Sequence, residues 1–363
     1  AVLRQSIRGL MTGGDFHDFL TTGANDRLFT DAFFGNLFFN AIDLNGNPFF
    51  PIGVNKRFDA FEEDPEGGEG LEFEGLWYWG MTRAPLELIA YIVENDRSYQ
   101  EVVTADYMMV NPTTSEILLS EVSFDEGAGH LVYKPGQNQG QTVRDDNLTT
   151  RFVQGIGTQV ESWQIIEYPH AGVLNSHAFL NRYPTTETNR NRARARWTYY
   201  HFLGIDIEKS AGRTTDPEAL ADTDNPTLNN PACTVCHVLH DPVAGTFQNY
   251  GNDGNYRDSF GALDSLPDTY KFPEDFDENS EPSEYQSEDT WFRDMREPGI
   301  DGKLAPDPIN SLQWLGQEIA EDERFTSASV KFWWPALMGA EALTAPETSS
   351  DRNFPEKLAA FEE

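Results

Sequence analysis

The sequence predicts a mainly α-helical protein with long loops and a small β insertion. Three observations support this fold class. Apolar residues follow a helical spacing over most of residues 1–110 and again after 189 and 309. Short β-prone runs separated by glycine occur only between 115 and 167. The 21 prolines and 29 glycines among 363 residues imply many loops, while 39% hydrophobic and 13% aromatic residues suffice for a folded core.

Residues 1–114 are expected to form an N-terminal helical region. Residues 1–10 have an amphipathic pattern typical of a helix. A second helix is expected from Thr82 to Val93, because proline at position 85 suits the first turn of a helix. A third is expected from Ser98 to Met109, where Ser98 and Glu101 have the spacing of a capping box.

Residues 115–169 are expected to form a β-rich insertion. The helical period is lost here, and three β-prone runs are separated by Gly-rich turns: Ile117–Phe124, His130–Tyr133 and Gln159–Ile166. A small sheet or hairpin is the interpretation of this region.

The remainder divides into a region over 170–260 and an acidic loop with C-terminal helices over 261–363. In the first, a helix is expected from residue 189 to a stop at Gly204. In the second, residues 261–308 are rich in Pro, Asp and Glu and have little period. Two helices then follow, at Ile309–Glu321 and at Thr326–Met338, the latter kinked near Pro335.

The charge of the chain is strongly negative. Its 60 acidic and 26 basic side chains give a formal net charge of −34. Such a surface repels phosphate backbones and anionic lipid, so neither nucleic acid nor a membrane surface is an expected partner. No run approaches the ~18 consecutive apolar residues of a membrane span. Adaptation to high salt and simple solubilisation both remain open as reasons for the charge.

One motif carries chemistry. Cys233, Cys236 and His237 form a C-x-x-C-H sequence, and the two cysteines are the only ones in the chain. This spacing is typical of covalent c-type haem attachment, with two thioethers and a proximal histidine ligand to the iron. One motif predicts one haem, and residues 170–260 are therefore expected to be the haem c-binding region. A redox disulfide expects a preceding strand, and a zinc site needs further ligands, so both alternatives are weaker.

Covalent haem attachment takes place outside the cytoplasm, which predicts a periplasmic, extracellular or cell-surface protein. Residues 1–30 contain no basic segment followed by an apolar one, so a signal peptide is absent from this numbering. The numbering is therefore expected to begin inside a processed protein.

The sixth ligand of the iron is less well defined. His240 lies on the same side of the porphyrin as His237 and cannot supply it. His177 is preferred, and Met295 is the alternative. Further histidines and methionines stay open: His170, Met109 and Met338.

Five arginines gather within a short stretch of this acidic chain: Arg182, Arg190, Arg192, Arg194 and Arg196. Arginine binds carboxylates in a bidentate manner, so Arg194 and Arg196 are candidates for contacts to the haem propionates. Internal salt bridges are the alternative for most of the cluster. Calcium is a weak further possibility at the acidic stretch 274–278 and at residues 43–47, which resemble the start of a calcium loop but are interpreted as a turn.

The segment around the motif resembles the planctomycete-type cytochrome c-like proteins. The resemblance consists of Cys233–His237, Asp241-Pro242-Val243, Asn249-Tyr250 and Gly254–Arg257, and it extends loosely over residues 170–340. Ala244-Gly245 and Gly251 depart from the family pattern beside the motif. The resemblance implies an exported, mainly helical haem protein in which a cytochrome c-like segment is embedded, and it implies no defined reaction.

Three functions remain open at this point. The leading hypothesis is a monohaem c-type cytochrome for electron transfer, as a possible subunit of a larger redox complex, with no catalytic residues beyond the ligands. The acidic surface favours a basic redox partner. The second hypothesis is a peroxidase- or oxidase-like haem enzyme with an open distal site, near His170 or an arginine. The third is a haem-stapled structural subunit of an extracellular assembly.

Overall fold

The computed structural model describes residues 2–30, 69–118, 120–137, 141–142, 164–165, 169–185, 189–210, 214–222, 226–250 and 296–342. The described part is mostly helical and contains three antiparallel pairs of short strands. The prediction of a mainly α protein with a small β insertion is confirmed at this level.

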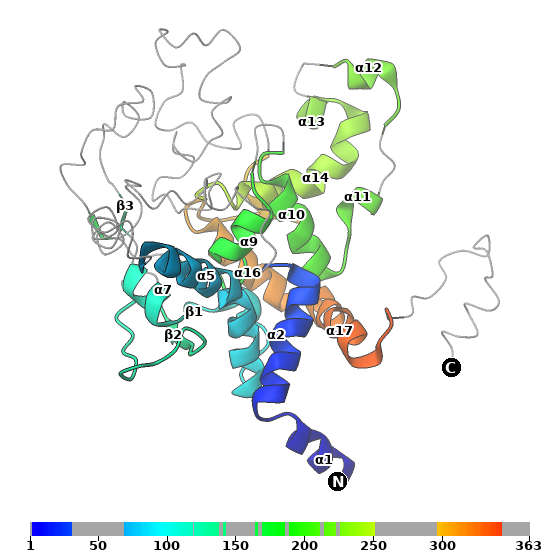
Figure 1. Cartoon of the computed structure of the whole chain (residues 1–363). Coiled ribbons are helices and arrows are strands. Elements are labelled where there is room, and N and C mark those ends of the chain that lie inside the picture. Colours follow the sequence, from blue (N-terminus) through cyan, green and yellow to red (C-terminus); the bar gives the residue numbers. More distant parts are fainter. Residues whose placement is uncertain are drawn as a thin grey trace.

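The N-terminal region is built from three helices: α1 (Val2–Leu10), α2 (Gly14–Leu28) and α5 (Glu69–Glu94). α1 confirms the amphipathic helix and extends away from the remaining helices (Figure 1). α2 packs along α5. α5 begins well before the predicted start at Thr82 and contains Pro85 in its interior. Burial of Met81, Ala84 and Leu86 around the proline stabilises the helix despite the missing hydrogen bond.

The helix expected over Ser98–Met109 is much shorter. α6 comprises only Glu101–Thr104, because Ala105 already has extended dihedral angles (φ −57°, ψ 133°). Met109 instead lies in strand β1 (Met108–Val110), which pairs with β2 (Lys134–Gly136) and places Met109 opposite Pro135.

Two of the predicted β runs are wrong. Residue 117 is the last residue of helix α7 (Pro112–Ile117), and the described residues from 118 to 124 form no strand. Residues 130–133 form a turn followed by irregular chain. The local cause is the cap: the Asn111 side chain accepts a hydrogen bond from the Thr114 amide at 2.8 Å and starts α7. The third run contains β4 (Gln164–Ile165), which pairs with β3 (Gln141–Thr142).

The middle of the chain carries α9 (His177–Arg182) and α10 (Arg192–Thr198), and α10 continues as a turn of π-helix, η1 (Tyr199–Leu203). Gly204 ends this helix with a φ of 69°, as predicted. Three short helices lead to the motif: α11 (Ile207–Ser210), α12 (Pro217–Leu220) and α13 (Pro226–Asn229). α14 (Pro231–Gly245) contains the motif itself and lies against α10 and α13 (Figure 1).

The C-terminal part begins with a hairpin of β5 (Gly299–Ile300) and β6 (Lys303–Leu304). The hairpin falls in the stretch predicted as a long acidic loop, of which residues 261–295 lie outside the described ranges. The two predicted helices are present as α16 (Ser311–Glu321) and α17 (Glu323–Met338), and Pro335 lies inside α17.

One hydrophobic core joins these elements. It runs from Ala24 in α2 to Phe332 in α17 and includes residues of α5, α9, α10, α14 and α16. Three of the four predicted regions thus share a core, and Tyr133 of the fourth packs against it. Within the described ranges, no helix combines the length and apolarity that a membrane crossing would need.

A glycine fixes the approach to α9. Gly172 has a φ of 57°, and a Cβ at this position would lie 2.2 Å from the carbonyl oxygen of Val102. Its amide donates to the Ala105 carbonyl at 3.0 Å, and the next amide, of Val173, donates to Val102 at 2.7 Å. Only glycine permits this close contact between the α6 segment and the chain that leads to His177.

Candidate haem attachment site

The C-x-x-C-H sequence lies in the first half of α14. Asn230 caps the helix by accepting a hydrogen bond from the Ala232 amide at 3.0 Å, and Pro231 occupies the first helical position. The second half of the helix, from His240 to Gly245, is entirely buried. The helix is therefore anchored at its C-terminal end and presents its N-terminal half at the surface.

Both thiols lie in that surface half. Cys233 and Cys236 are free and partly exposed. A separation of three residues places them about 60° apart around the helix, and His237 lies about 40° from Cys233 on the other side. Two thiols and an imidazole thus share one face, as thioether attachment with a proximal ligand requires.

His237 is held by a buried carboxylate. Its Nδ1 lies 2.9 Å from Oδ1 of Asp241, one helical turn further along α14. The side chain of Asp241 is fully buried, whereas that of His237 is 22% exposed. Arg192 of α10 completes the group: its Nε donates to Oδ1 at 2.7 Å and its Nη2 donates to Oδ2 at 3.1 Å.

The charge state of Asp241 follows from these partners. Burial by itself would raise the pKa of the carboxyl, but the hydrogen bonds from His237 and Arg192 outweigh it and hold the pKa below its usual value. Asp241 is therefore an ionised acceptor. Because a carboxylate can only accept hydrogen bonds, Nδ1 of His237 carries a proton.

This tautomer prepares His237 for a metal. With the proton on Nδ1, the lone pair of the neutral imidazole lies on Nε2, which has no hydrogen-bond partner in the described part of the chain. Metal-binding histidines commonly donate the other ring N–H to a carboxylate or carbonyl, which fixes the ring orientation. Asp241 supplies that contact here.

His240 lies beside this group and is buried rather than at the surface. Its ring centroid is 6.5 Å from that of His237. Burial, partly offset by Asp241, lowers its pKa to about 4, so the ring is neutral. Its Nε2 is a buried atom for which the described residues provide no hydrogen-bond partner. An uncompensated buried polar atom on the face of the two thiols is consistent with a polar group arriving from a cofactor.

Taken together, these residues fit a covalently bound haem. The thiols are free, the imidazole has the required tautomer, and an unsatisfied nitrogen lies on the same face. In the described ranges, no three His, Cys, Asp or Glu side chains converge where they could hold a metal ion.

The arginines divide into different roles. Arg194 is fully buried, and its guanidinium donates to three backbone carbonyls and one side-chain oxygen: Leu180 O, Tyr183 O, Tyr250 O and Asn191 Oδ1. These contacts use the guanidinium N–H groups that would otherwise bind a haem propionate. The geometry therefore favours a structural role for Arg194 over the propionate contact inferred from the sequence.

Arg196 also uses its guanidinium internally. Its Nε and Nη2 donate to the two carboxylate oxygens of Asp206 at 3.0 Å each, and its Nη1 lies 2.9 Å from Glu208. Hydrogen bonding to Asp206 raises its pKa further. This is the internal salt bridging that was the alternative for the arginine cluster.

The candidates for a sixth ligand lie in different environments. His177 opens α9 and is buried, and His170 is close enough for the two rings to influence each other, with burial lowering the pKa of His170 to about 4. Met109 is buried in β1, and Met338 is exposed at the end of α17. Met295 lies outside the described residues, as do both stretches considered for calcium, 43–47 and 274–278.

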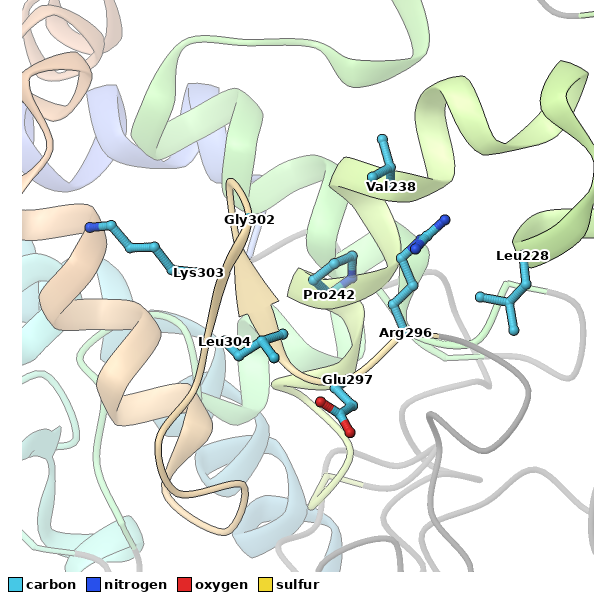
Figure 2. A pocket seen from close by; sticks show the side chains of 8 residues that line it. All are labelled: Leu228, Val238, Pro242, Arg296, Glu297, Gly302, Lys303 and Leu304. Atoms are coloured by element: carbon cyan, nitrogen blue, oxygen red, sulfur yellow. The ribbon is translucent and has the colours of Figure 1, made fainter.

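A cavity of about 340 Å³ lies on the opposite side of α14. Figure 2 shows Val238 and Pro242 of the helix facing Arg296 and the β5–β6 hairpin across it. Val238 and Pro242 lie about 140° and 180° around the helix from Cys233. The cavity is therefore separate from the face that carries the thiols.

Two of the three residues in the His237, Asp241 and Arg192 group were not predicted from the sequence as site residues, namely Asp241 and Arg192. The signal for Asp241 was its position four residues after His237, which places both side chains on one helical face. Arg192 was visible only as one of five arginines, because its partner lies 49 residues away in the chain.

Comparison with known proteins adds no further constraint. No protein-family model, curated protein or solved structure matches the chain. The resemblance to the planctomycete-type cytochrome c-like proteins therefore stays a prediction.

Proposed function

We propose that this chain is a monohaem c-type cytochrome that transfers electrons outside the cytoplasm, as a subunit of a larger redox complex. The observation that carries the proposal is the geometry of one helical turn. Cys233 and Cys236 present free thiols on the face of His237, and the contact from Asp241 leaves Nε2 of His237 as the ligand atom.

In this proposal each residue has a defined part. The bound haem would supply a one-electron redox centre. Cys233 and Cys236 would hold it covalently, and Nε2 of His237 would be its protein ligand. Electron exchange with a partner protein would require no bond of the polypeptide to form or break.

The charge of the chain bears on the partner. A net charge of −34 favours association with a basic redox protein and makes the association rate fall with increasing salt. The basic partner is thus proposed from the charge of the chain, and the location outside the cytoplasm is proposed from the chemistry of haem attachment.

The first test is haem attachment. The chain should be exported in a host with a c-type haem maturation system, denatured, and examined for haem that remains on the polypeptide and for its pyridine haemochrome spectrum. We expect one haem per chain. The double variant C233S/C236S should lose it completely, because these are the only cysteines.

Thr234→Ser provides the matched control, since it lies between the cysteines and leaves the C-x-x-C-H spacing intact. It should retain the haem. A wild-type chain that is exported and folded but carries no covalent haem would contradict the proposal.

A haem enzyme with an open distal site is the second candidate. The observation that favours it is the pair of neighbouring histidines His170 and His177: His177 is buried, and burial lowers the pKa of His170 to about 4, which keeps it neutral as a distal base must be. Carbon monoxide distinguishes the two. A reduced spectrum that carbon monoxide leaves unchanged supports electron transfer by a six-coordinate haem, whereas a shifted spectrum favours the enzyme.

A further inference from the structure

We infer that Asp241 and Arg192 act as positioning residues that set the reduction potential of the haem through His237, in opposite directions. This inference rests on the proposed function and deepens it. Neither residue would touch the haem iron. Both act through the hydrogen bond to Nδ1 of His237.

The contact between Asp241 and His237 is short and protected from water. Nδ1 and Oδ1 lie 2.9 Å apart, and the carboxylate is fully buried. A charge-assisted hydrogen bond in such surroundings is about twice as strong as a neutral one. Solvent screening, which weakens surface ion pairs, has little effect on this pair.

The direction of the effect follows from charge. A carboxylate that accepts the Nδ1 proton increases the electron density of the imidazole and makes Nε2 a more basic ligand. A more basic ligand stabilises the oxidised, more positive iron relative to the reduced iron. Asp241 therefore lowers the reduction potential.

Arg192 opposes this effect. Its guanidinium binds both oxygens of the same carboxylate, at 2.7 Å and 3.1 Å, and withdraws negative charge from it. Removal of Arg192 should therefore lower the potential, whereas removal of the negative charge of Asp241 should raise it.

One further titratable group, His240, borders the carboxylate and is unchanged in every variant. His240 lies next along α14, and burial keeps its ring neutral. The second oxygen of Asp241 is bound to Arg192. The Asp241 carboxylate thus connects His237 to the positive charge of Arg192. The carboxylate and the guanidinium can each be altered separately.

The experiment is redox titration of the intact, haem-loaded protein followed by visible absorbance. We expect Asp241→Asn to raise the potential and Arg192→Gln to lower it. Outer-shell substitutions typically change metal affinity or activity by 10–100-fold. If the preference for the oxidised state changes about tenfold, the shift is roughly 59 mV for one electron.

Asp206→Asn is the matched control. Asp206 accepts two hydrogen bonds from Arg196, which lies on the same helix as Arg192, and its salt bridges are to Arg196 and Lys209. It should leave the potential unchanged. If Asp241→Asn does not fold, Arg192→Gln keeps the carboxylate in place and still tests the direction in which the reduction potential shifts.

The outcomes separate the inference from the proposed function. Opposite shifts in Asp241→Asn and Arg192→Gln support the inference. Covalent haem with potentials equal to that of Asp206→Asn would overturn it while the proposed function stands. Shifts in the same direction would also overturn it. Absence of covalent haem from the wild-type chain would overturn the proposed function itself.

Discussion

The two halves of α14 differ in burial although they belong to one continuous helix. The first half carries the thiols, and its valines Val235 and Val238 are 57% and 46% exposed. In the second half Val243 is fully buried, as are Ala244 and Asp241. The surface half presents reactive groups, and the buried half fixes their orientation. The proposed haem attachment therefore depends on the packing of the buried half.

The buried half depends on a polar anchor as well as on apolar packing. Arg194 binds the Tyr250 carbonyl just beyond α14 and ties it to the chain between α9 and α10. Tyr250 also donates from its hydroxyl to the Pro169 carbonyl at 3.2 Å. The orientation of α14 is thus determined by segments that are distant in the sequence.

The largest effect is expected from Arg194→Met, which would break the anchor. The substitution leaves several buried acceptors without donors, and each costs about 1–3 kcal/mol. We expect the free energy of unfolding, measured with urea, to fall by about 4 kcal/mol or more. A loss below about 1 kcal/mol would show that α14 is held by other contacts.

A matched pair of valines compares the two halves directly. Val243→Ala removes a fully buried side chain and should lower the free energy of unfolding by about 2 kcal/mol. Val238→Ala changes a half-exposed side chain on the same helix and should cost less than about 0.5 kcal/mol. Equal losses in the two variants would contradict the division of α14 into halves.

Acid sensitivity should arise from buried histidines such as His201. Burial, followed by the charges of Arg27 and Arg182, lowers the pKa of His201 to about 3 from an ordinary 6.5. Above pH 6.5 the His201 ring is neutral in both the folded and the unfolded chain, so it contributes nothing to the pH dependence of stability. As the pH falls from 6.5 toward 3, only the unfolded chain takes up the proton, so the folded state loses stability.

His201→Phe tests this directly. The substitution should reduce the loss of stability between pH 7 and pH 5 by about 2 kcal/mol, measured by urea unfolding at both values. Tyr183, whose hydroxyl lies 3.1 Å from Nε2 of His201, keeps its hydrogen bond to the Leu28 carbonyl. An unchanged pH dependence would assign the acid sensitivity to other groups.

The smallest effect is expected at Arg196. Its salt bridges to Asp206 and Glu208 are partly exposed, and such pairs contribute about 1 kcal/mol or less. Arg196→Ala should therefore lower the free energy of unfolding by no more than this, and by less at high salt. A loss as large as that of Arg194→Met would show that burial does not separate the two arginines.

Several parts of the fold could be predicted from local patterns. The helices at α1, α16 and α17 follow the spacing of their apolar residues, and Gly204 ends η1 as expected. The β insertion was predicted less well, because β-prone residues at 117–124 and 130–133 lie in a capped helix, a turn and loops. Strands β1 and β2 are too short for a recognisable alternation and exist through their pairing with each other.

The sequence by itself determined the chemistry that is available: two cysteines, an adjacent histidine and a carboxylate one turn later. These lie within nine residues of one helix, so helical geometry alone brings them to one side. The tertiary structure decided how that chemistry is tuned and anchored. Arg192 and Arg194 are the same residue type two positions apart. Arg192 nevertheless binds Asp241, whereas Arg194 is fully buried in the core. Their difference arises because neighbouring positions on α10 face different, distant segments of the chain, which only the folded protein brings together.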